Sequence, residues 1–174
     1  DATKDDLVLA LLSGGGSANW IAPADGITFA QKQDVTRQLL RSGAPISAVN
    51  TVRKHLSRIK RGRLARAGKL AEIVTLAISD VPHDDPSAIA SGPTVPDPTT
   101  LADARALVAK YGFKVDEAIR DALNDAKNES CKPGDAAFAR AQFELIARPK
   151  ASLDAAIRLA RDAGYEIIDL GADL

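Results

Sequence analysis

A short, uninterrupted apolar run that ends abruptly in glycines constrains the fold of this chain more than any other feature. The run is Leu7–Leu12, and residues 13–17 follow it with three consecutive glycines. An apolar run of this length without polar interruption is typical of a strand buried on both faces of a parallel sheet. The junction therefore predicts the first strand-to-loop connection of an α/β domain.

Further strands and helices are expected to alternate along the chain. Segments rich in β-branched and apolar residues predict three more strands, at 73–78, 142–147 and 165–170. Apolar residues at helical spacing predict helices at 30–42, 48–60, 101–111, 116–128 and 152–163. This alternation predicts one α/β domain over residues 1–174, a three-layer Rossmann-like fold with a mainly parallel sheet covered by helices.

Composition excludes several classes of protein. The 23 basic and 23 acidic residues cancel, so no net positive field attracts nucleic acid or an anionic membrane. The single cysteine, Cys131, forms no internal disulfide and lies in a loop-like run, which favours an incidental thiol in a reducing compartment. No apolar stretch is long enough to span a membrane and the start is no signal peptide, so we expect a cytoplasmic protein. Because methionine is absent, we expect a fragment of a longer chain.

The glycine-rich segment is the first candidate binding site. Consecutive glycines let backbone N–H groups approach an anion, and two hydroxyls add donors. The residues expected to bind phosphate are Ser13, Gly14, Gly15, Gly16 and Ser17. A tight turn is the alternative, and neither known nucleotide fingerprint is present. A G-x-G-x-x-G frame that starts at Gly14 ends on Asn19, and no P-loop sequence occurs.

The second candidate is the polar face of the 48–60 helix. Asn50, Arg53, Lys54, Ser57 and Lys60 share one face, beside an apolar stripe. Donors with no acidic partner suit an anionic ligand, while a solvated helix face is an equally good explanation. His55 lies at the edge of the apolar stripe, so we expect a packed, hydrogen-bonded histidine rather than a base.

The third candidate is the long proline-punctuated segment 81–99, with the aspartate just before it. Asp80, Asp84 and Asp97 offer the oxygen ligands that Mg²⁺ prefers, although aspartates also cap turns. Asp80, at the end of an expected buried strand, is the least explained by capping. His83 has no second histidine or cysteine at zinc-ligand spacing. A phosphate cradle, cations and carboxylates together are the parts that a phosphoryl transferase needs.

These motifs resemble a known family. Segments 12–18, 50–60, 79–81, 84–87, 89–94 and 96–98, in this order, resemble the class II glycerate kinases, the glycerate 2-kinases with a carboxy-terminal MOFRL domain. Residues 145–149 further resemble the bacterial branch labelled hydroxypyruvate reductase and associated with tartrate degradation.

The resemblance implies Mg²⁺-assisted, ATP-dependent phosphorylation of the 2-hydroxyl of D-glycerate. It implies that this chain is a fragment of the larger, Rossmann-like domain, without the amino-terminal segment that carries a lysine and without the MOFRL domain that supplies an arginine. The chain alone is then expected to be inactive. Its expected partners are D-glycerate, a nucleotide and the MOFRL domain of the same protein. The oligomeric state stays open, with a homodimer as one option.

The resemblance also suggests roles for the candidate residues. The glycine-rich segment would hold phosphate oxygens, while Arg53, Lys54 and Lys60 would neutralise charge. Asp80 would bind Mg²⁺ or orient the hydroxyl as a base, assisted by Asp84 and Asp97. Asn50, Ser91 and Thr94 would position the substrate. Arg61 and His83 stand where the family usually has glycine, which would strain the backbone wherever φ must be positive.

Two other functions remain as alternatives. A nicotinamide-dependent hydroxypyruvate reductase fits the label of the bacterial branch. Against it stand the broken glycine fingerprint and the placement of Asp34 inside an expected helix rather than at a strand end. A non-catalytic domain that binds phosphorylated metabolites is the second alternative.

Overall fold

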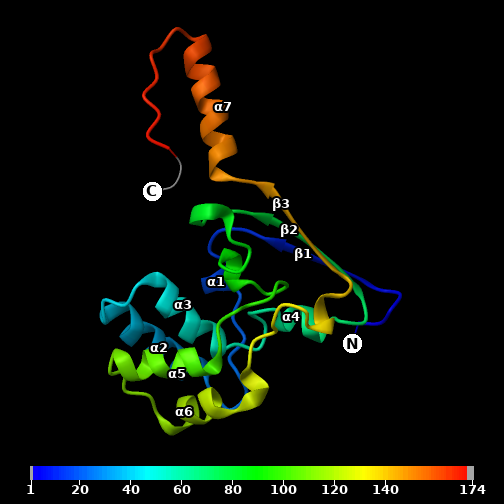
Figure 1. Cartoon of the computed structure of the whole chain (residues 1–174), viewed down its shortest axis with the longest axis vertical. Helices are drawn as coiled ribbons and strands as arrows, with labels where there is room; N and C mark the ends of the chain where they lie inside the picture. The colour runs from blue at the N-terminus through cyan, green and yellow to red at the C-terminus, as the bar shows by residue number, and fades with distance from the viewer. Residues whose placement is uncertain (1, 172–174) are drawn as a thin grey trace.

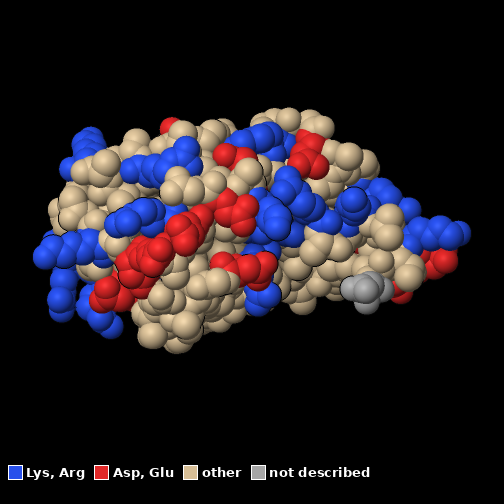
Figure 2. Space-filling view, turned by 90° about the horizontal axis from the view of Figure 1, so that it is seen from below, with Lys and Arg blue, Asp and Glu red and all other residues tan. Residues whose placement is uncertain are grey.

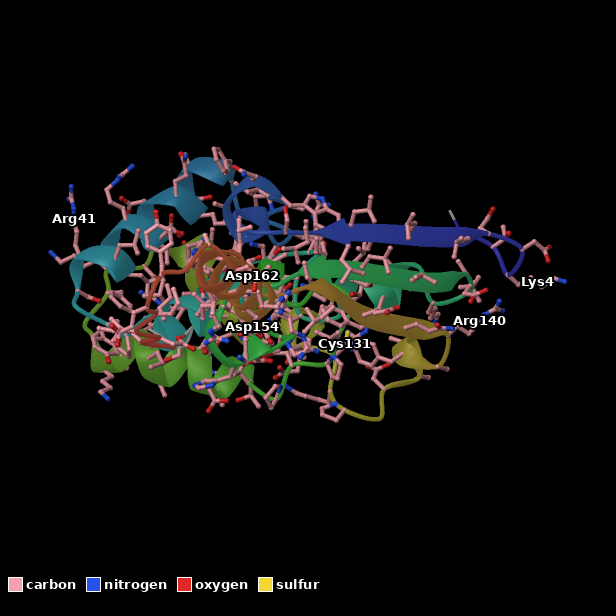
Figure 3. The ribbon with its side chains drawn as sticks, turned by 90° about the horizontal axis from the view of Figure 1, so that it is seen from above. Lys4, Arg41, Cys131, Arg140, Asp154 and Asp162 are labelled. Carbon is pink, nitrogen blue, oxygen red and sulfur yellow. The ribbon has the colours of Figure 1, made fainter. Side chains whose placement is uncertain are left out.

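The protein is an α/β structure built on one parallel sheet. The computed structural model describes residues 2–171 (Figure 1). Three parallel strands, β1 (Leu7–Leu12), β2 (Glu72–Ile78) and β3 (Ala141–Ala147), lie in the order β1-β2-β3. Figure 3 shows them side by side with Lys4 and Arg140 near the same end, where the Arg140 guanidinium donates to the Lys4 carbonyl at 3.3 Å. The α/β class and the first three expected strands are confirmed.

Helices and short 3₁₀ turns fill the connections between the strands. The helices are α1 (Gly16–Asn19), α2 (Phe29–Arg41), α3 (Ile46–His55), α4 (Arg63–Ala67), α5 (Leu101–Lys110), α6 (Glu117–Asn124) and α7 (Pro149–Asp162). The turns are η1 (Pro82–Asp84), η2 (Ile89–Ser91), η3 (Ala126–Asn128) and η4 (Ala136–Phe138). In the described part of the chain, no helix combines the length and apolar character needed to cross a membrane.

The main hydrophobic core lies among α2, α3, α5 and α6, which form a cluster on the opposite side of the sheet from α7 (Figure 1). Leu39, Val52 and Ile119 are fully buried there, as helical spacing predicts. Thr28 begins α2 with a capping box, since its hydroxyl accepts from the Gln31 N–H and the Gln31 side chain accepts from the Thr28 N–H. Seen from below, this side of the molecule carries acidic and basic patches next to one another (Figure 2).

The helix expected at 48–60 ends at His55, which corrects the sequence-based boundary. Beyond it, the backbone bonds to residues 22–24 instead of to the preceding helical turn. The Ala24 N–H donates to the Leu56 carbonyl at 3.1 Å, and the Arg58 N–H donates to the Ala22 carbonyl at 2.9 Å. Because these bonds replace helical ones, Ser57 and Lys60 do not share a helix face with Arg53 and Lys54.

The expectation that β1 is buried on both faces is wrong. Its side chains alternate between a buried face, with Ala10 and Leu12, and an open face, with Leu7, Leu9 and Leu11 exposed by 61, 53 and 69%. The buried face packs against the segment that contains η2, including Ile89 and Ala90. Within the described residues, helices cover only one side of this strand.

The fourth expected strand, at 165–170, is also wrong. This segment follows α7 and has no strand structure. Figure 1 shows that α7 points away from the sheet and that the following segment runs back alongside α7 rather than beside a strand. No side chain of α7 is buried. The apolar pattern predicted the helix correctly but not the surface that it packs against.

Gly62 and Gly43 allow a matched test of backbone strain against packing. Both have a left-handed backbone, with φ of 74° and 73°. A Cβ at Gly62 would lie 2.5 Å from Phe138 Cζ and 2.8 Å from Cys131 Cβ, whereas nothing lies within 4 Å of one at Gly43. We expect Gly43→Ala to cost about 1 kcal/mol of unfolding free energy from φ alone. Gly62→Ala should cost about 1 to 3 kcal/mol more, because Phe138 and the buried Cys131 must move.

Urea unfolding of the two variants and the wild-type protein measures both costs. Equal losses would mean that the space around Gly62 relaxes freely and that φ alone sets its glycine requirement.

Candidate functional site

The candidate site lies where β1 and β2 end at the same edge of the sheet. The strands pair in register up to Leu12 and Ala77, so the loops that follow them emerge together. A Cβ on Gly14 would lie only 2.8 Å from Asp80 Oδ2, which places the Asp80 carboxylate directly against the glycine loop. The two candidate segments therefore form one site.

The glycine loop, residues 13–17, is also joined to the η2 turn. The hydroxyls of Ser17 and Ser91 lie 2.7 Å apart. A Cβ on Gly16 would meet Ala90 Cβ at 2.9 Å, so only glycine allows this approach. In the part of the chain that the structure describes, the backbone N–H groups of Gly14 and Gly15 donate to no protein acceptor. The loop thus keeps donors available for an anion.

Strained backbone gathers in the two segments around this loop. Ala90 and Ser91 have φ of 49° and 67°, and His83 and Asp84 have φ of 60° and 54°. A non-glycine residue in the left-handed region costs roughly 1–2 kcal/mol. Such strain is typical of functional sites, where the surrounding structure enforces it.

Three cations, Lys32, Arg53 and Lys60, lie near the glycine loop on the side of α2 and α3. The Lys60 ammonium donates to the Ser17 carbonyl, and the Lys32 ammonium donates to the Leu56 carbonyl at 2.9 Å. Burial, together with the charges of Lys60 and Arg53, lowers the pKa of Lys32 to about 7. Burial, together with the charges of Arg53 and Lys54, lowers the pKa of Lys60 to about 8. An anion bound here would relieve this mutual repulsion.

Lys32 is the site residue that sequence reasoning missed. It lies at helical spacing to Val35 and Leu39, on the apolar stripe of α2, and only 7% of it is exposed. A lysine within an apolar stripe was the available signal, because lysine is almost never fully buried without a partner. With Ser17 and Arg53 it lines a cleft of about 380 Å³ between α1, α2 and α3.

Lys54 does not lie on an unpartnered surface, contrary to the sequence-based expectation. Its ammonium is buried and lies 3.8 Å from the buried carboxylate of Asp97. Asp97 also accepts a hydrogen bond from the Thr99 hydroxyl at 2.8 Å. Burial lowers the pKa of Lys54, against the opposing effect of Asp97. This buried ion pair ties α3 to the proline-rich segment.

The three aspartates proposed as metal ligands have separate surroundings. Asp80 is exposed beside Gly14, Asp84 lies 3.6 Å from Arg148 Nε, and Asp97 belongs to the buried ion pair. Among the residues that the structure describes, no three His, Cys, Asp or Glu side chains form a group suited to a metal ion. Asp80 is therefore the carboxylate of the three that lies open at the glycine loop.

The three residues proposed to position substrate also lie in different surroundings. Ser91 touches the glycine loop through Ser17. Thr94 is buried and accepts a hydrogen bond from the Thr75 hydroxyl at 2.7 Å, which ties it to β2. Asn50 is half-buried on α3. Their roles toward a substrate remain predictions.

Arg61 and His83 both adopt the positive φ that the comparison with glycine implied, at 62° and 60°. Arg61 is fully buried, and its Nη2 makes only long contacts, of 3.4 and 3.5 Å, to the carbonyls of His55 and Ser57. Its Nε and Nη1 have no hydrogen-bond partner in the described part of the molecule. Arg61 therefore combines backbone strain with buried, unsatisfied donors.

His55 is a packed histidine, as expected. It is fully buried, and its Nδ1 lies 2.8 Å from the Thr51 carbonyl. Because a carbonyl only accepts, the neutral ring carries its proton on Nδ1. Burial, with the positive charge of Arg61 nearby, lowers the pKa of His55 to about 4.

Residues 1–124 match the family described as "Domain of unknown function (DUF4147)". The chain belongs to this family. A relative from Thermotoga maritima named "D-glycerate 2-kinase" is 39% identical over 172 residues, which are 98% of this chain and 40% of that protein. An Agrobacterium vitis protein named "Putative hydroxypyruvate reductase" is 53% identical over 167 residues, 96% of this chain and 37% of that protein.

A solved structure agrees with these relatives. The crystal structure of a glycerate kinase from Thermotoga maritima superimposes with a TM-score of 0.83 and 38% identity, over 95% of this chain and 38% of that one. The resemblance drawn from the motifs is confirmed by these names. This DUF4147 chain spans about two fifths of the length of the relatives that it matches.

The buried neutral His55 makes stability sensitive to acid. The unfolded ring takes up a proton below about pH 6.5, but the folded ring resists until about pH 4. The stabilisation is present above pH 6.5 and is lost as pH falls through this window, about 3 kcal/mol in all. His55→Gln, which keeps an amide donor for Thr51, should flatten the dependence of unfolding free energy on pH between 6.5 and 4. Parallel wild-type and variant profiles in urea unfolding would contradict this.

The Lys54–Asp97 pair should be structural. Lys54→Met leaves the Asp97 carboxylate buried without its cation, at an expected cost of about 3 to 5 kcal/mol of unfolding free energy. The matched control is Arg58→Met, which breaks an exposed pair with Asp25 and should cost less than about 1 kcal/mol. Denaturant unfolding of both variants compares them, and a small loss for Lys54→Met would leave its ammonium free for another role.

Proposed function

We propose that this chain is part of a glycerate 2-kinase, which transfers the γ-phosphoryl group of ATP to the 2-hydroxyl of D-glycerate. The observation that carries the proposal is the Asp80 carboxylate set directly against a glycine loop whose other side borders Lys60. A carboxylate on one side of a phosphate cradle and cations on the other suit an in-line transfer to a hydroxyl. The similarity to proteins named glycerate kinase supports the same activity.

In this proposal, the P–O bond to the β-phosphate breaks as the bond from phosphorus to the substrate oxygen forms, and the hydroxyl loses its proton. The glycine loop holds phosphate oxygens through its N–H groups and through the Ser17 hydroxyl. Lys60 and Arg53 offset the negative charge of the phosphates. Asn50 and Ser91 position the hydroxy acid. Asp80 either accepts the proton or holds the metal ion.

Mg²⁺ is the metal ion that the proposal requires. It binds proteins through one or two carboxylates and takes its other ligands from phosphates and water. The exposed Asp80 fits this pattern, and Asp84 lies nearby in sequence on a turn of its own. Asp97 does not fit, since its carboxylate is buried against Lys54. When bound, Mg²⁺ would neutralise charge on the phosphates.

The complete active site also needs parts of the protein outside this chain. We propose that an amino-terminal segment supplies a lysine and that a MOFRL domain closes the cleft and supplies an arginine. The length of the relatives, of which this chain covers about two fifths, supports this division. The proposed protein is cytoplasmic and acts on small molecules, and this chain alone is inactive.

A hydroxypyruvate reductase is the second candidate, favoured by the name of the 53% identical relative. Its nicotinamide site would need an acidic residue at a strand end. Asp34 instead lies on the exposed face of α2, paired with Arg37 at 3.2 Å. Saturable binding of NADH, followed by its fluorescence, would favour the reductase.

Phosphorus NMR of the complete protein with Mg-ATP and D-glycerate tests the proposed function. A 2-phosphoglycerate signal is expected, because the transferred phosphate and its position are both read directly. Intact ATP with no phosphoglycerate would overturn the proposal and favour either the reductase or a non-catalytic phosphometabolite-binding domain.

Replacing Asp80 tests the role of the carboxylate. Asp80→Asn should lower kcat about a hundredfold or more, since it removes a general base or a metal ligand while keeping the side-chain shape. Asp121→Asn, on the exposed face of α6, is the matched control and should keep full activity. If Asp80 is the base, the acid limb of the pH profile disappears. If it is a ligand, the Mg²⁺ concentration needed for half activity rises. Near-normal turnover would remove Asp80 from the mechanism.

A further inference from the structure

The cleft between α1, α2 and α3 is separate from the edge where Asp80 lies, and the two meet at Ser17. The cleft holds about 380 Å³ and is bordered by residues of opposite character. Ser17, Lys32 and Arg53 are buried or half-buried. Ile21, Phe29 and Leu40 are exposed by 39, 48 and 62% and form an apolar wall. We refer to it as the cationic cleft.

Two of the three cations that line the cationic cleft, Lys32 and Arg53, are not balanced by an acidic side chain of the described residues, while the third, Arg37, is paired with Asp34 at 3.2 Å. No aspartate or glutamate is among the residues that line it, all of which lie in the described part of the chain. Lys32 uses one N–H on the Leu56 carbonyl and keeps two, and Arg53 forms no ion pair within residues 2–171. Each of the charged side chains that shift the pKa of Lys32 is itself a cation. The cleft is therefore complementary to an anion with several charges.

The apolar wall indicates that the ligand has an apolar or flat part as well as negative charge. A three-carbon hydroxy acid has an anionic group but no flat or apolar surface to cover Phe29 and Ile21. A nucleoside polyphosphate has both, with charge at one end and a ring system at the other. The volume lies in the range of pockets that bury ligands of that size.

The position of Ser17 sets the direction of such a ligand. Its backbone and hydroxyl belong to the glycine loop, and its side chain also lines the cationic cleft. Phosphates that start beside Lys32 and Arg53 would continue past Ser17 toward Gly14, where the Asp80 carboxylate lies. The terminal phosphate would then face the proposed acceptor side.

We propose that the cationic cleft is the nucleotide site of the proposed kinase, with the phosphates on Lys32, Arg53 and Ser17 and the base on the wall of Phe29 and Ile21. This inference rests on the proposed function and adds to it two residues, Lys32 and Phe29. It leaves the hydroxy acid on the Asp80 side of the glycine loop.

A second hollow is the alternative position for the nucleotide. It holds about 350 Å³ on the other side of the glycine loop and is lined by Gly14, Asn19 and Trp20, a residue that is 40% exposed. It has an aromatic wall but no lysine or arginine among its lining residues, all of them in the described part of the chain. Charge therefore favours the cationic cleft for the phosphates. Variants at Trp20 and Phe29 distinguish the two hollows as positions for the base.

Calorimetric titration of the complete protein with ADP and with inorganic tripolyphosphate tests the assignment. Phe29→Ala should weaken ADP binding about tenfold, as loss of one stacked ring does, and leave tripolyphosphate within about twofold. Lys32→Gln should weaken both ligands about tenfold, because one charge-assisted contact is lost. Lys127→Gln, an exposed change of the same charge, is the control and should change neither. Thermal unfolding of each variant monitors folding, and Phe29 is exposed enough to be replaced safely.

Failure of this inference is distinct from failure of the proposed function. A wild-type protein that forms 2-phosphoglycerate, with ADP affinity unchanged by Phe29→Ala and Lys32→Gln, overturns the nucleotide site alone. So does a loss of ADP affinity in Trp20→Ala but not in Phe29→Ala, which would place the base in the second hollow. A wild-type protein that forms no phosphoglycerate and binds no ADP overturns the proposed function and this inference together.

Discussion

Parallel pairing of β1 with β2 is the constraint on which the candidate site depends. The two strands run in register from Leu7 opposite Glu72 to Leu12 opposite Ala77. Their carboxyl ends therefore release two loops at one edge, and Gly14 meets Asp80 although 66 positions separate them in the numbering. An antiparallel pair would have placed these residues at opposite ends of the sheet.

A series of backbone hydrogen bonds holds the η2 turn and the residues after it near that edge of the sheet. The N–H groups of Arg61, Gly62 and Leu64 donate to the carbonyls of residues 91, 92 and 93, at 3.1, 2.7 and 3.1 Å. These bonds fix the turn in which Ala90 and Ser91 have positive φ. The residues that follow α3 thus hold the η2 turn in place instead of forming a cationic helix face, and Ser57, Lys60 and Arg61 among them are buried.

The sequence predicted the strands and most of the helices, and it predicted which loops form the candidate site. The apolar runs identified β1, β2 and β3, and the glycines and Asp80 marked the site because parallel strands end at one edge. It did not predict element boundaries or pairings where tertiary contacts override the spacing of apolar residues. The helical pattern continues to residue 60, but the backbone of Leu56 and Arg58 bonds to residues 24 and 22 instead. Residues 165–170 have strand composition but no strand structure. The cleft beside Lys32 could not be predicted from the sequence, because it exists only once the consecutive helices α1, α2 and α3 pack against one another.

The open face of β1 has a consequence for handling this chain in the laboratory. Leu7, Leu9 and Leu11 form an apolar strip on an edge strand, whose backbone donors and acceptors on one side have no strand to pair with in the described residues. A flat apolar edge is a template for pairing with another chain. When this chain is produced by itself, we expect this strip to favour self-association through β1. A charged residue in place of Leu9 is expected to weaken that association without touching the glycine loop.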